Sequence, residues 1–179
     1  MRIWAVLSAI LLAGCASPTV SNPGPRTLET RSPSALRLGD IGLQLPGSDW
    51  FVADQRPFWA RAFIVERSTD VVLIVSIDDG TVQDEIRSKR LGLEGRDDGS
   101  HATLAAVEGP DAAGISYFRL YDLDRDGQPF HCVFYAFRQL TDRPARVVKV
   151  TGMWFTTDDG RYTPQALSLL RSVEYLPDE

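Results

Sequence analysis

The sequence is poor in the residue types that most catalytic sites require. Its 179 residues include two cysteines, Cys15 and Cys132, and two histidines, His101 and His131. Hydrolytic metal sites and acid–base dyads usually draw on more histidines than this. The sequence also contains no CxxC, HExxH, Walker A or dinucleotide-binding pattern. These absences predict a protein that is not an enzyme and that carries no metal and no cofactor.

Excess positive charge and long apolar runs are absent as well. The chain has 19 lysines and arginines against 24 aspartates and glutamates, a formal net charge of −5. A mildly acidic chain is poorly suited to bind nucleic acid or to dock electrostatically on anionic lipid. The apolar stretch Ile3–Ala13 has eleven residues and the next, Val71–Ile77, has seven, and both are too short for a transmembrane helix. We therefore predict no nucleic-acid partner and no spanning segment.

The first residues have the organisation of a signal peptide. Arg2 precedes the apolar stretch Ile3–Ala13, and this stretch runs into the sequence LAGC at positions 12–15. The LAGC sequence resembles the lipobox of bacterial lipoproteins. The resemblance implies that residues 1–14 are removed as a lipoprotein signal peptide, that the thiol of Cys15 forms a thioether with diacylglycerol, and that the new amine is acylated, so that the protein carries palmitate-type chains. The alternative is a conventional secretory signal whose cleavage site falls near a cysteine.

The same resemblance predicts a location in the cell. Two or three acyl chains on Cys15, at about 0.8 kcal/mol per buried methylene, would anchor the protein to a membrane far more firmly than one myristoyl chain. In Gram-negative lipoproteins an aspartate after the modified cysteine tends to retain the protein at the inner membrane, whereas Ala16-Ser17 follow Cys15 here. For a Gram-negative cell we therefore expect a lipid-anchored protein at the outer membrane, with its folded domain in the periplasm.

After Cys15 the chain divides into a tether and a domain. Residues 15–34 contain four prolines and few large apolar side chains, a composition that predicts a disordered, flexible tether. Residues 35–179 are rich in strand signals and predict a periplasmic α+β domain. The strands are expected at 36–46 (a hairpin that turns at Gly39-Asp40), 50–53, 60–66, 71–77, 103–107, 115–123, 130–140 and 145–155.

Two helices are expected among these strands. The sequence TVQD at positions 81–84 is a weak capping box and indicates a first helix. For the second helix, Thr163 is predicted to be the N-cap and Pro164 to occupy the first helical position. Leu167 and Leu170 then fall on one face, so this helix should pack on the sheet.

The order of elements resembles the PsbP/Mog1-like fold. The resemblance is carried by an opening hairpin with LPGSDW, a helix after SIDDGT, a long late hairpin, and a closing helix in ALSLLRSVEYL, and it spans roughly Ala35–Leu176. It implies an antiparallel β-sheet flanked by helices, an α/β/α sandwich. It also implies a role in binding or assembly, and it brings no catalytic residues and no ligand residues to this chain.

The stretch DLDRDG, Asp122–Gly127, matches the opening of an EF-hand calcium loop. An EF-hand needs a bidentate carboxylate at its twelfth position, which is Val133 here, and helical flanks, whereas both flanks read as strands. A hairpin turn with Gly127 at positive φ explains the same residues without an ion. We predict a turn, with weak calcium binding by the clustered aspartates as the alternative.

Few other residues are candidates for chemistry. Cys132 lies between large apolar residues, so it is expected to be a buried small hydrophobe, with pairing to another molecule as the alternative. Neighbours on a strand face opposite ways, so His131 and Cys132 cannot form a thiolate–imidazolium pair. The pairs Asp78-Asp79 and Asp158-Asp159 lie beside glycines and are interpreted as turn residues rather than catalytic carboxylates.

The aromatic residues leave two functions open. Large side chains at consecutive positions, as in Trp50-Phe51 and Met153-Trp154-Phe155, are either buried on both faces of a sheet or partly exposed as a docking surface. The first hypothesis is a non-catalytic envelope lipoprotein that binds an unknown envelope protein or supports assembly. The alternative is a small-molecule carrier or weak hydrolase with an aromatic-lined cleft near Trp50, Trp59 and Trp154.

Overall fold

The computed structural model describes residues 35–56, 60–69, 71–94, 103–141 and 146–176. By its contacts the chain separates into two units, Met1–Arg31 and Ser32–Glu179, and every described residue belongs to the second unit. The expected signal peptide, the tether and Cys15 lie outside the described residues, as do Trp59 and His101.

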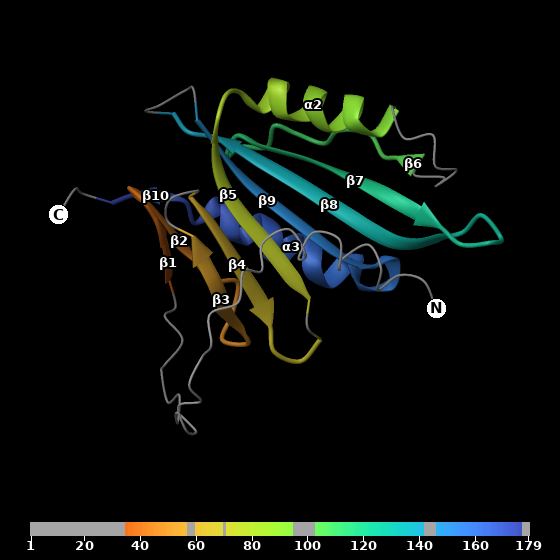
Figure 1. The fold of residues 1–179 in the computed structure, drawn as a ribbon, viewed down its shortest axis with the longest axis horizontal. Helices are drawn as coiled ribbons and strands as arrows, with labels where there is room; N and C mark the ends of the chain where they lie inside the picture. The colour runs from red at the N-terminus through yellow and green to blue at the C-terminus, as the bar shows by residue number, and fades with distance from the viewer. Residues whose placement is uncertain (1–34, 57–59, 70, 95–102, 142–145, 177–179) are drawn as a thin grey trace, which may run out of the picture. The chain divides into compact units, whose positions relative to one another are not determined.

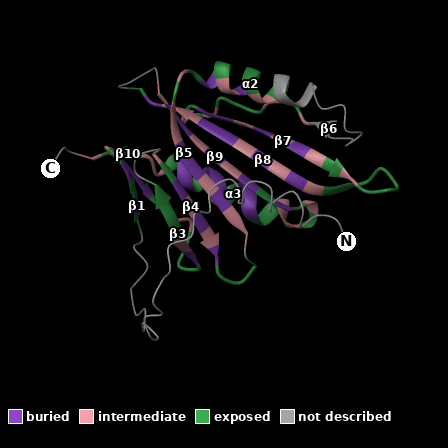
Figure 2. Cartoon of the chain, viewed as in Figure 1, coloured by how far each residue is buried: buried purple, intermediate pink, exposed green. Residues whose placement is uncertain are grey.

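Seven strands form one antiparallel sheet (Figure 1). In their order across the sheet they are β3 (Trp50–Arg56), β4 (Arg61–Glu66), β5 (Val72–Asp79), β9 (Arg146–Phe155), β8 (Pro129–Gln139), β7 (Ile115–Leu123) and β6 (Thr103–Leu104). Buried and half-buried residues alternate along much of β8 (Figure 2), so each face of this strand meets a different environment.

A second, smaller sheet joins the two ends of the domain. It consists of β1 (Ala35–Leu38), β2 (Ile41–Gln44) and β10 (Glu174–Tyr175), in the order β1-β2-β10 and antiparallel. The β1–β2 hairpin turns at Gly39, whose φ of 62° suits glycine, as the sequence predicts. Arg146 at the start of β9 makes a bidentate ion pair with Asp40 at 2.9 and 3.0 Å, which links the small sheet to the large one.

The first helix is α2 (Val82–Glu94), and its start agrees with the sequence prediction. The Thr81 hydroxyl accepts the backbone N–H of Asp84 at 3.2 Å and donates to the Asp84 carboxylate at 2.7 Å. The backbone N–H of Val82 donates to the side chain of Gln139 on β8 at 3.1 Å, so a tertiary contact satisfies a second N–H of the first turn.

The second helix, α3 (Asp159–Arg171), begins five residues earlier than predicted. A 3₁₀ turn, η2 (Thr156–Asp158), leads into it directly from β9. The assignment of Thr163 as N-cap and of Pro164 as first helical residue is therefore wrong, because both lie inside the helix. The Thr163 hydroxyl instead donates to the Asp159 carboxylate one turn earlier, at 2.7 Å.

Buried polar contacts fix α3 against the sheet. Glu66 at the end of β4 is 2% exposed, and its carboxylate accepts hydrogen bonds from Arg161 at 2.6 Å, from Ser68 at 2.8 Å and from Thr69. The Thr69 hydrogen bond, together with those of Ser68 and the charge of Arg161, lowers the pKa of Glu66 below its ordinary value although burial acts in the opposite direction. At the other end of α3, Arg138 donates to the carbonyl of Leu170 at 2.7 Å.

Two apolar clusters cover opposite faces of the large sheet. One cluster contains Phe134 of β8 and Leu170 of α3 together with four apolar residues of the small sheet, Leu36, Leu38, Ile41 and Leu43. The other contains Phe137 of β8 and Ile86 of α2, with Tyr135 packed against it. Because Phe134 and Tyr135 are neighbours on one strand, α3 and α2 lie on opposite sides of the sheet, as Figure 1 shows.

The α3 side of the sheet is packed closely around Trp154. This side chain is 3% exposed and its ring lies 5.6 Å from Tyr162 and 5.4 Å from Phe134. A Cβ added at Gly152 would come within 2.5 Å of the Trp154 ring and 2.6 Å of Leu73. Glycine at this position therefore lets the indole lie flat against β9.

The domain is thus α+β, with antiparallel sheets and two helices, which confirms the predicted class. Every strand predicted within the described residues is present, and β10 was not predicted. Among the described helices, none combines the length and the apolar character that crossing a bilayer requires.

Candidate functional site

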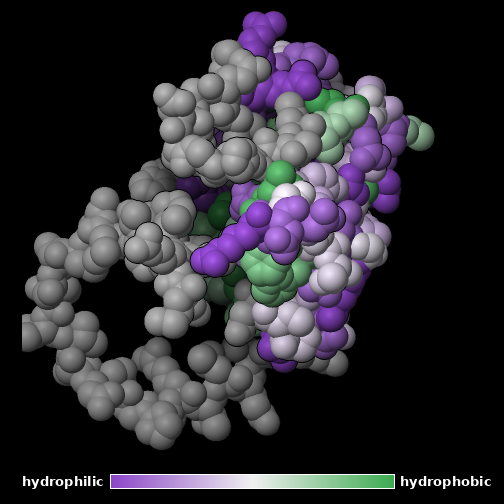
Figure 3. Space-filling model, turned by 90° about the vertical axis from the view of Figure 1, so that its right-hand side faces the viewer, coloured by the Kyte–Doolittle hydropathy of each residue, from purple (hydrophilic) through white to green (hydrophobic). Residues whose placement is uncertain are grey.

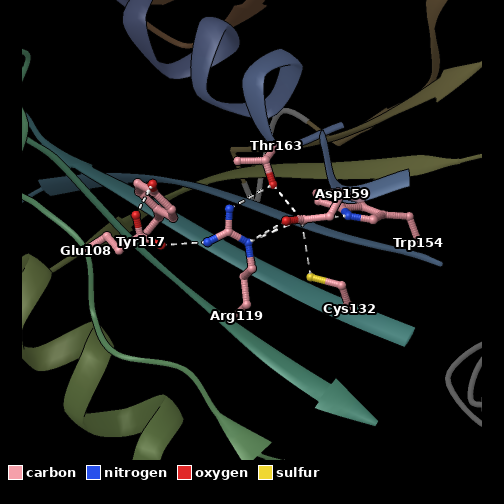
Figure 4. A network of polar contacts seen from close by, with 7 residues as sticks. All are labelled: Glu108, Tyr117, Arg119, Cys132, Trp154, Asp159 and Thr163. Atoms are coloured by element: carbon pink, nitrogen blue, oxygen red, sulfur yellow. Dashed lines mark hydrogen bonds and ion pairs between the residues drawn. The ribbon is translucent and has the colours of Figure 1, made fainter. Parts of the chain in front are cut away.

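The most connected polar cluster is centred on Asp159, the first residue of α3 (Figure 4). Its carboxylate accepts the Thr163 hydroxyl at 2.7 Å and the indole N–H of Trp154 at 3.2 Å. The Nε of Arg119 on β7 lies 3.0 Å from Oδ2 of the same carboxylate. The thiol of Cys132 on β8 approaches Oδ1 at 3.7 Å. One carboxylate therefore joins three neighbouring strands to the first turn of α3.

Arg119 extends the cluster to the segment before β7. Its Nη1 donates to the Glu108 carboxylate at 2.7 Å, and Glu108 also accepts the hydroxyl of Tyr117. The guanidinium lies over the rings of Tyr117 and Phe134, at 5.2 and 5.9 Å from their centroids. The Arg119 side chain is 13% exposed, so these partners replace most of its contact with water.

The pKa values follow from this arrangement. Burial acts to raise the pKa of Asp159, but hydrogen bonds from Thr163 and Trp154 and the charge of Arg119 lower it below its ordinary value overall. Burial, reinforced by the negative charge of Asp159, raises the pKa of the Cys132 thiol to about 12. The hydrogen bond to Glu108 and burial raise the pKa of Tyr117. At neutral pH the thiol is therefore protonated, while Asp159 and Arg119 are charged.

The cluster suits a structural role better than bond-making chemistry. A nucleophilic cysteine needs a thiolate, and the sulfur of Cys132 is buried beside a carboxylate that opposes ionisation. Asp159 already engages Arg119, Trp154 and Thr163, which leaves it little capacity to accept a proton from another group. The arrangement instead fixes the angle at which α3 leaves β9.

The expected burial of Cys132 is confirmed, since its side chain is 0% exposed. Cys132 pairs in register with Trp154 and His131 pairs with Phe155. The two side chains therefore point to opposite faces of the sheet, as the strand prediction requires. Within the described part of the chain, no group of three or more His, Cys, Asp or Glu side chains is placed to hold a metal ion.

The two aspartate pairs are not simple turn residues. Asp78 and Asp79 are the last residues of β5, and Asp78 pairs with Lys149 of β9 at 2.9 Å. Asp158 ends the 3₁₀ turn, while Asp159 is the centre of the polar cluster. The turn interpretation was therefore wrong for Asp159. The adjacent glycine, Gly160, suggested a turn, whereas the partners of Asp159 come from distant strands.

The DLDRDG stretch forms the β7–β8 hairpin turn, which confirms the turn prediction. The carboxylate of Asp124 accepts the backbone N–H groups of Asp126 and Gln128, at 2.9 and 2.8 Å. Gly127 has a φ of 75°, and its N–H donates to the carbonyl of Asp124 at 3.1 Å. The aspartate at the third position of the supposed calcium loop thus serves the backbone of the turn itself.

We expect replacement of Asp124 by alanine to destabilise the domain by about 0.5–2 kcal/mol, because two backbone N–H groups lose their acceptor, as at a helix N-cap. The loss should be equal with calcium and with chelator when measured by urea unfolding. Asp126→Ala, which changes an exposed carboxylate in the same turn, is the matched control and should have a smaller effect. A calcium-dependent rise of several degrees in the wild-type Tm, absent from Asp124→Ala, would instead establish a calcium site.

The aromatic-lined cleft of the alternative hypothesis is not formed by the tryptophans that the structure describes. Trp50 is 2% and Trp154 is 3% exposed, and both rings pack on Tyr162 in the core. The core interpretation is confirmed for these two residues. Their neighbours in the sequence behave differently, because Met153 is 40% and Phe155 is 49% exposed.

These exposed residues belong to an aromatic patch, defined here as Phe130, His131, Met153 and Phe155. The ring centroids of Phe130 and His131 lie 4.3 Å apart, and Phe155 lies 5.3 Å from Phe130 and 4.9 Å from His131. The patch lies beside the β7–β8 turn, on the sheet face opposite α3. The sequence signal for the patch is the run of consecutive apolar residues Met153-Trp154-Phe155, because neighbours on a strand face opposite sides of the sheet.

Comparisons with known proteins bear on the fold alone. No protein-family model and no curated protein sequence matches the chain. Among solved structures, the chain is similar to the crystal structure of LpqN, which is involved in cell envelope biogenesis of Mycobacterium tuberculosis. The sequences are 10% identical, the match covers 80% of this chain and 90% of that chain, and the TM-score is 0.51. The domain therefore shares its general fold with a protein of cell envelope biogenesis.

Proposed function

We propose that this protein is a non-catalytic lipoprotein of the cell envelope whose domain binds another envelope protein or supports its assembly. The LAGC sequence at positions 12–15 supports a lipid anchor on Cys15, and Ala16-Ser17 favour the outer membrane with the domain in the periplasm. The element order supports membership of the PsbP/Mog1-like proteins, and the similarity to LpqN favours an envelope role.

The observation that carries the proposal is the aromatic patch. Phe130, Met153 and Phe155 are 43%, 40% and 49% exposed. Contiguous exposed apolar side chains on a folded domain usually mark an interaction surface, and large aromatic side chains contribute most of the binding energy at such surfaces. The polar cluster around Asp159, by contrast, satisfies its own charges. The exposed patch and the self-satisfied polar cluster together favour a role in binding a partner over turnover of a substrate.

The tether gives this proposal a test. A flexible segment of residues 16–34 has an end-to-end distance of about 25 Å and would let a lipid-held domain search for a partner near the membrane. We expect deletion of Ser17–Pro33 to reduce crosslinking of the domain to its envelope partner in intact cells, because the shortened tether restricts simultaneous engagement. Replacement of the same residues by a Gly/Ser segment of equal length should preserve crosslinking.

The measurement is the yield of one specific crosslinked product, normalised to the amount of protein in the membrane. Circular dichroism of the purified variants checks that the domain stays folded. The opposite result would be a purified domain that turns over an ester, peptide or glycan at a rate that one point mutation abolishes. Such turnover would place the protein among enzymes and refute the proposal.

A further inference from the structure

The face of the large sheet that carries α2 is only partly covered by this helix. Seven strands at about 4.8 Å spacing make a sheet about 29 Å wide, whereas a helix with its side chains is about 10–12 Å wide. Val82 and Ile86 of α2 cluster with Phe118, Phe137 and Val147 at one end of β7, β8 and β9. The other end of the same strands extends beyond this cluster.

An apolar row crosses the face beside the α2 cluster and meets that cluster at Val133. Phe51 of β3 pairs in register with Val65 of β4, and Val65 pairs with Val72 of β5. On the next strands, Met153 of β9 pairs with Val133 of β8. In this row Met153 is exposed and the other residues named, from Phe51 to Val133, are half-buried. The aromatic patch lies at its end, and Figure 3, which views the side of the domain with the β7–β8 turn, shows apolar side chains among hydrophilic ones there.

The half-buried rings of Phe51, Phe63 and Tyr135 on this face each have a cation as partner, whereas the rings of the patch have none among the described residues. The guanidinium of Arg67 lies 5.5 Å from the ring of Phe51, and that of Arg56 lies 5.8 Å from the ring of Phe63. Among the described residues, Phe130 and Phe155 contact only each other and His131 through their rings. The patch therefore has exposed aromatic surface on which a cation from another molecule can be placed.

The charges beside the patch also favour a cation. Asp122 pairs in register with His131, so its carboxylate lies on the same face as the patch. Asp126 is exposed in the adjoining turn, where Arg125 is the single basic residue. Neither Asp122 nor Asp126 has an ion-pair partner among the residues that the structure describes. These two carboxylates would attract lysine or arginine and would repel an anionic lipid surface.

Helix α2 shows how a helix lies on this face. Its Ile86 packs on the apolar side chains of the sheet, while the ammonium group of Lys89 lies 5.5 Å from the ring of Tyr135 on β8. Glu85 completes the contact by an ion pair with Lys149 on β9 at 2.9 Å. The aromatic patch lies farther along the same two strands and offers the same chemistry, an apolar surface with rings that accept a cation.

We propose that the aromatic patch receives an amphipathic helix of the protein partner, with its apolar side on Met153 and Phe155 and with lysine or arginine side chains over the rings of Phe130 and Phe155. The basic side chains face Asp122 and Asp126. This inference rests on the proposed binding function and adds the surface and the chemistry of the partner. The mode is recognition of one face of a helix through residues spaced by three and four positions.

The test uses a soluble chain from residue 16, without the signal peptide and Cys15, because all described residues belong to a unit with its own core. The probe is a labelled helical peptide of about 15 residues, with leucines along one side and lysines bordering that side, three or four positions from the leucines. We expect fluorescence anisotropy to show saturable binding, and Phe155→Ser to weaken it at least about tenfold, as for a central aromatic anchor. Tyr175→Ser, which changes an exposed aromatic outside the patch, is the matched control and should leave binding unchanged.

Charge is tested separately from apolar contact. A matched peptide with glutamate in place of lysine should bind at least tenfold more weakly, and Asp122→Asn with Asp126→Asn should weaken the lysine peptide about threefold and reduce its salt dependence. The inference is overturned if the lysine peptide does not bind, if both peptides bind equally, or if Phe155→Ser has no effect. It is also overturned if the patch instead mediates self-association or vesicle binding that Phe155→Ser abolishes.

A photo-crosslinking residue in the full lipidated chain separates this inference from the proposed function. With the crosslinker at position 155, we expect capture of an envelope protein that the lysine peptide displaces. Capture from position 175 but not from position 155 would refute the patch as the binding surface and retain the proposed function. If no exposed position of the domain captures a protein, the proposed function fails as well.

Discussion

Replacement of Cys15 by serine is expected to abolish incorporation of labelled palmitate and to leave an uncleaved precursor in the cell. A serine hydroxyl cannot form the thioether that the lipobox resemblance implies for this position. Acyl chains contribute about 0.8 kcal/mol per buried methylene, so the loss of two or three chains would remove essentially the whole membrane affinity of the mature protein. Labelling in growing cells, followed by gel separation of precursor and mature forms, measures both effects at once.

The control for this experiment is the second cysteine. Cys132→Ala removes a thiol that is buried in the core, and labelling should persist because that side chain plays no part in the anchor. If Cys15→Ser still takes up label, the lipid is attached to another residue and the lipobox interpretation is wrong. If the wild-type protein takes up no label, residues 1–14 act as an ordinary secretory signal. The protein would then need another means of staying at the envelope.

Much of the fold is predictable from local patterns. Strands such as β7 and β8 are rich in aromatic and β-branched residues and are separated by a turn that needs Gly127 at positive φ. The hairpin at Gly39 follows from the same chemistry. These signals depend on neighbours in the sequence, and the structure confirms them. β3 extends to Arg56, beyond the predicted Ala53, because a register shift between Val52 and Asp54 allows pairing to continue past a break in the apolar pattern.

The start of α3 shows where local reasoning fails. Thr163 followed by Pro164 is a strong N-terminal signal, yet the helix begins at Asp159. The competing signal is tertiary, because Asp159 at the first position meets Arg119 and Trp154 from the sheet. A carboxylate at the first turn also interacts favourably with the helix dipole. A sequence pattern cannot reveal partners on other strands before the strand order and register are known.

The same reason explains why the functional surface was predicted only in outline. The sequence shows that Met153-Trp154-Phe155 must face both sides of a sheet, but it does not show how much of each side a helix covers. The answer depends on the position of α2, which covers Phe137 and leaves Phe155 exposed. The position of α2 on the sheet therefore decides which side chains on this face belong to the core and which remain exposed.

Among substitutions of polar residues, we expect the largest loss of stability from replacement of Asp159, the centre of the polar cluster at the start of α3. Asp159→Ala should destabilise the domain by about 2–4 kcal/mol, since removal of one partner of a buried ion pair leaves the other charge uncompensated. Arg119 would then be a guanidinium only 13% exposed that keeps Glu108 as its remaining carboxylate partner. The indole N–H of Trp154 would lose its acceptor as well. Urea unfolding of the wild type and the variant measures the difference.

Two further variants identify the cause. Asp158→Ala, one residue earlier, changes a carboxylate that makes no ion pair with the described residues and should cost little. Asp159→Asn keeps acceptors for Thr163 and Trp154 but removes the charge, so its cost should be intermediate. Because the pKa of Asp159 is lowered in the folded state, the wild type gains stability from this group above the ordinary value of 3.8 and loses it as the pH falls through the folded pKa. Asp159→Asn should therefore lose less stability than the wild type on acidification. If Asp159→Ala costs no more than Asp158→Ala, the cluster is not what holds α3 on the sheet. The apolar contacts of Leu170 and Tyr162 and the hydrogen bonds of Arg161 and Arg138 must then hold it.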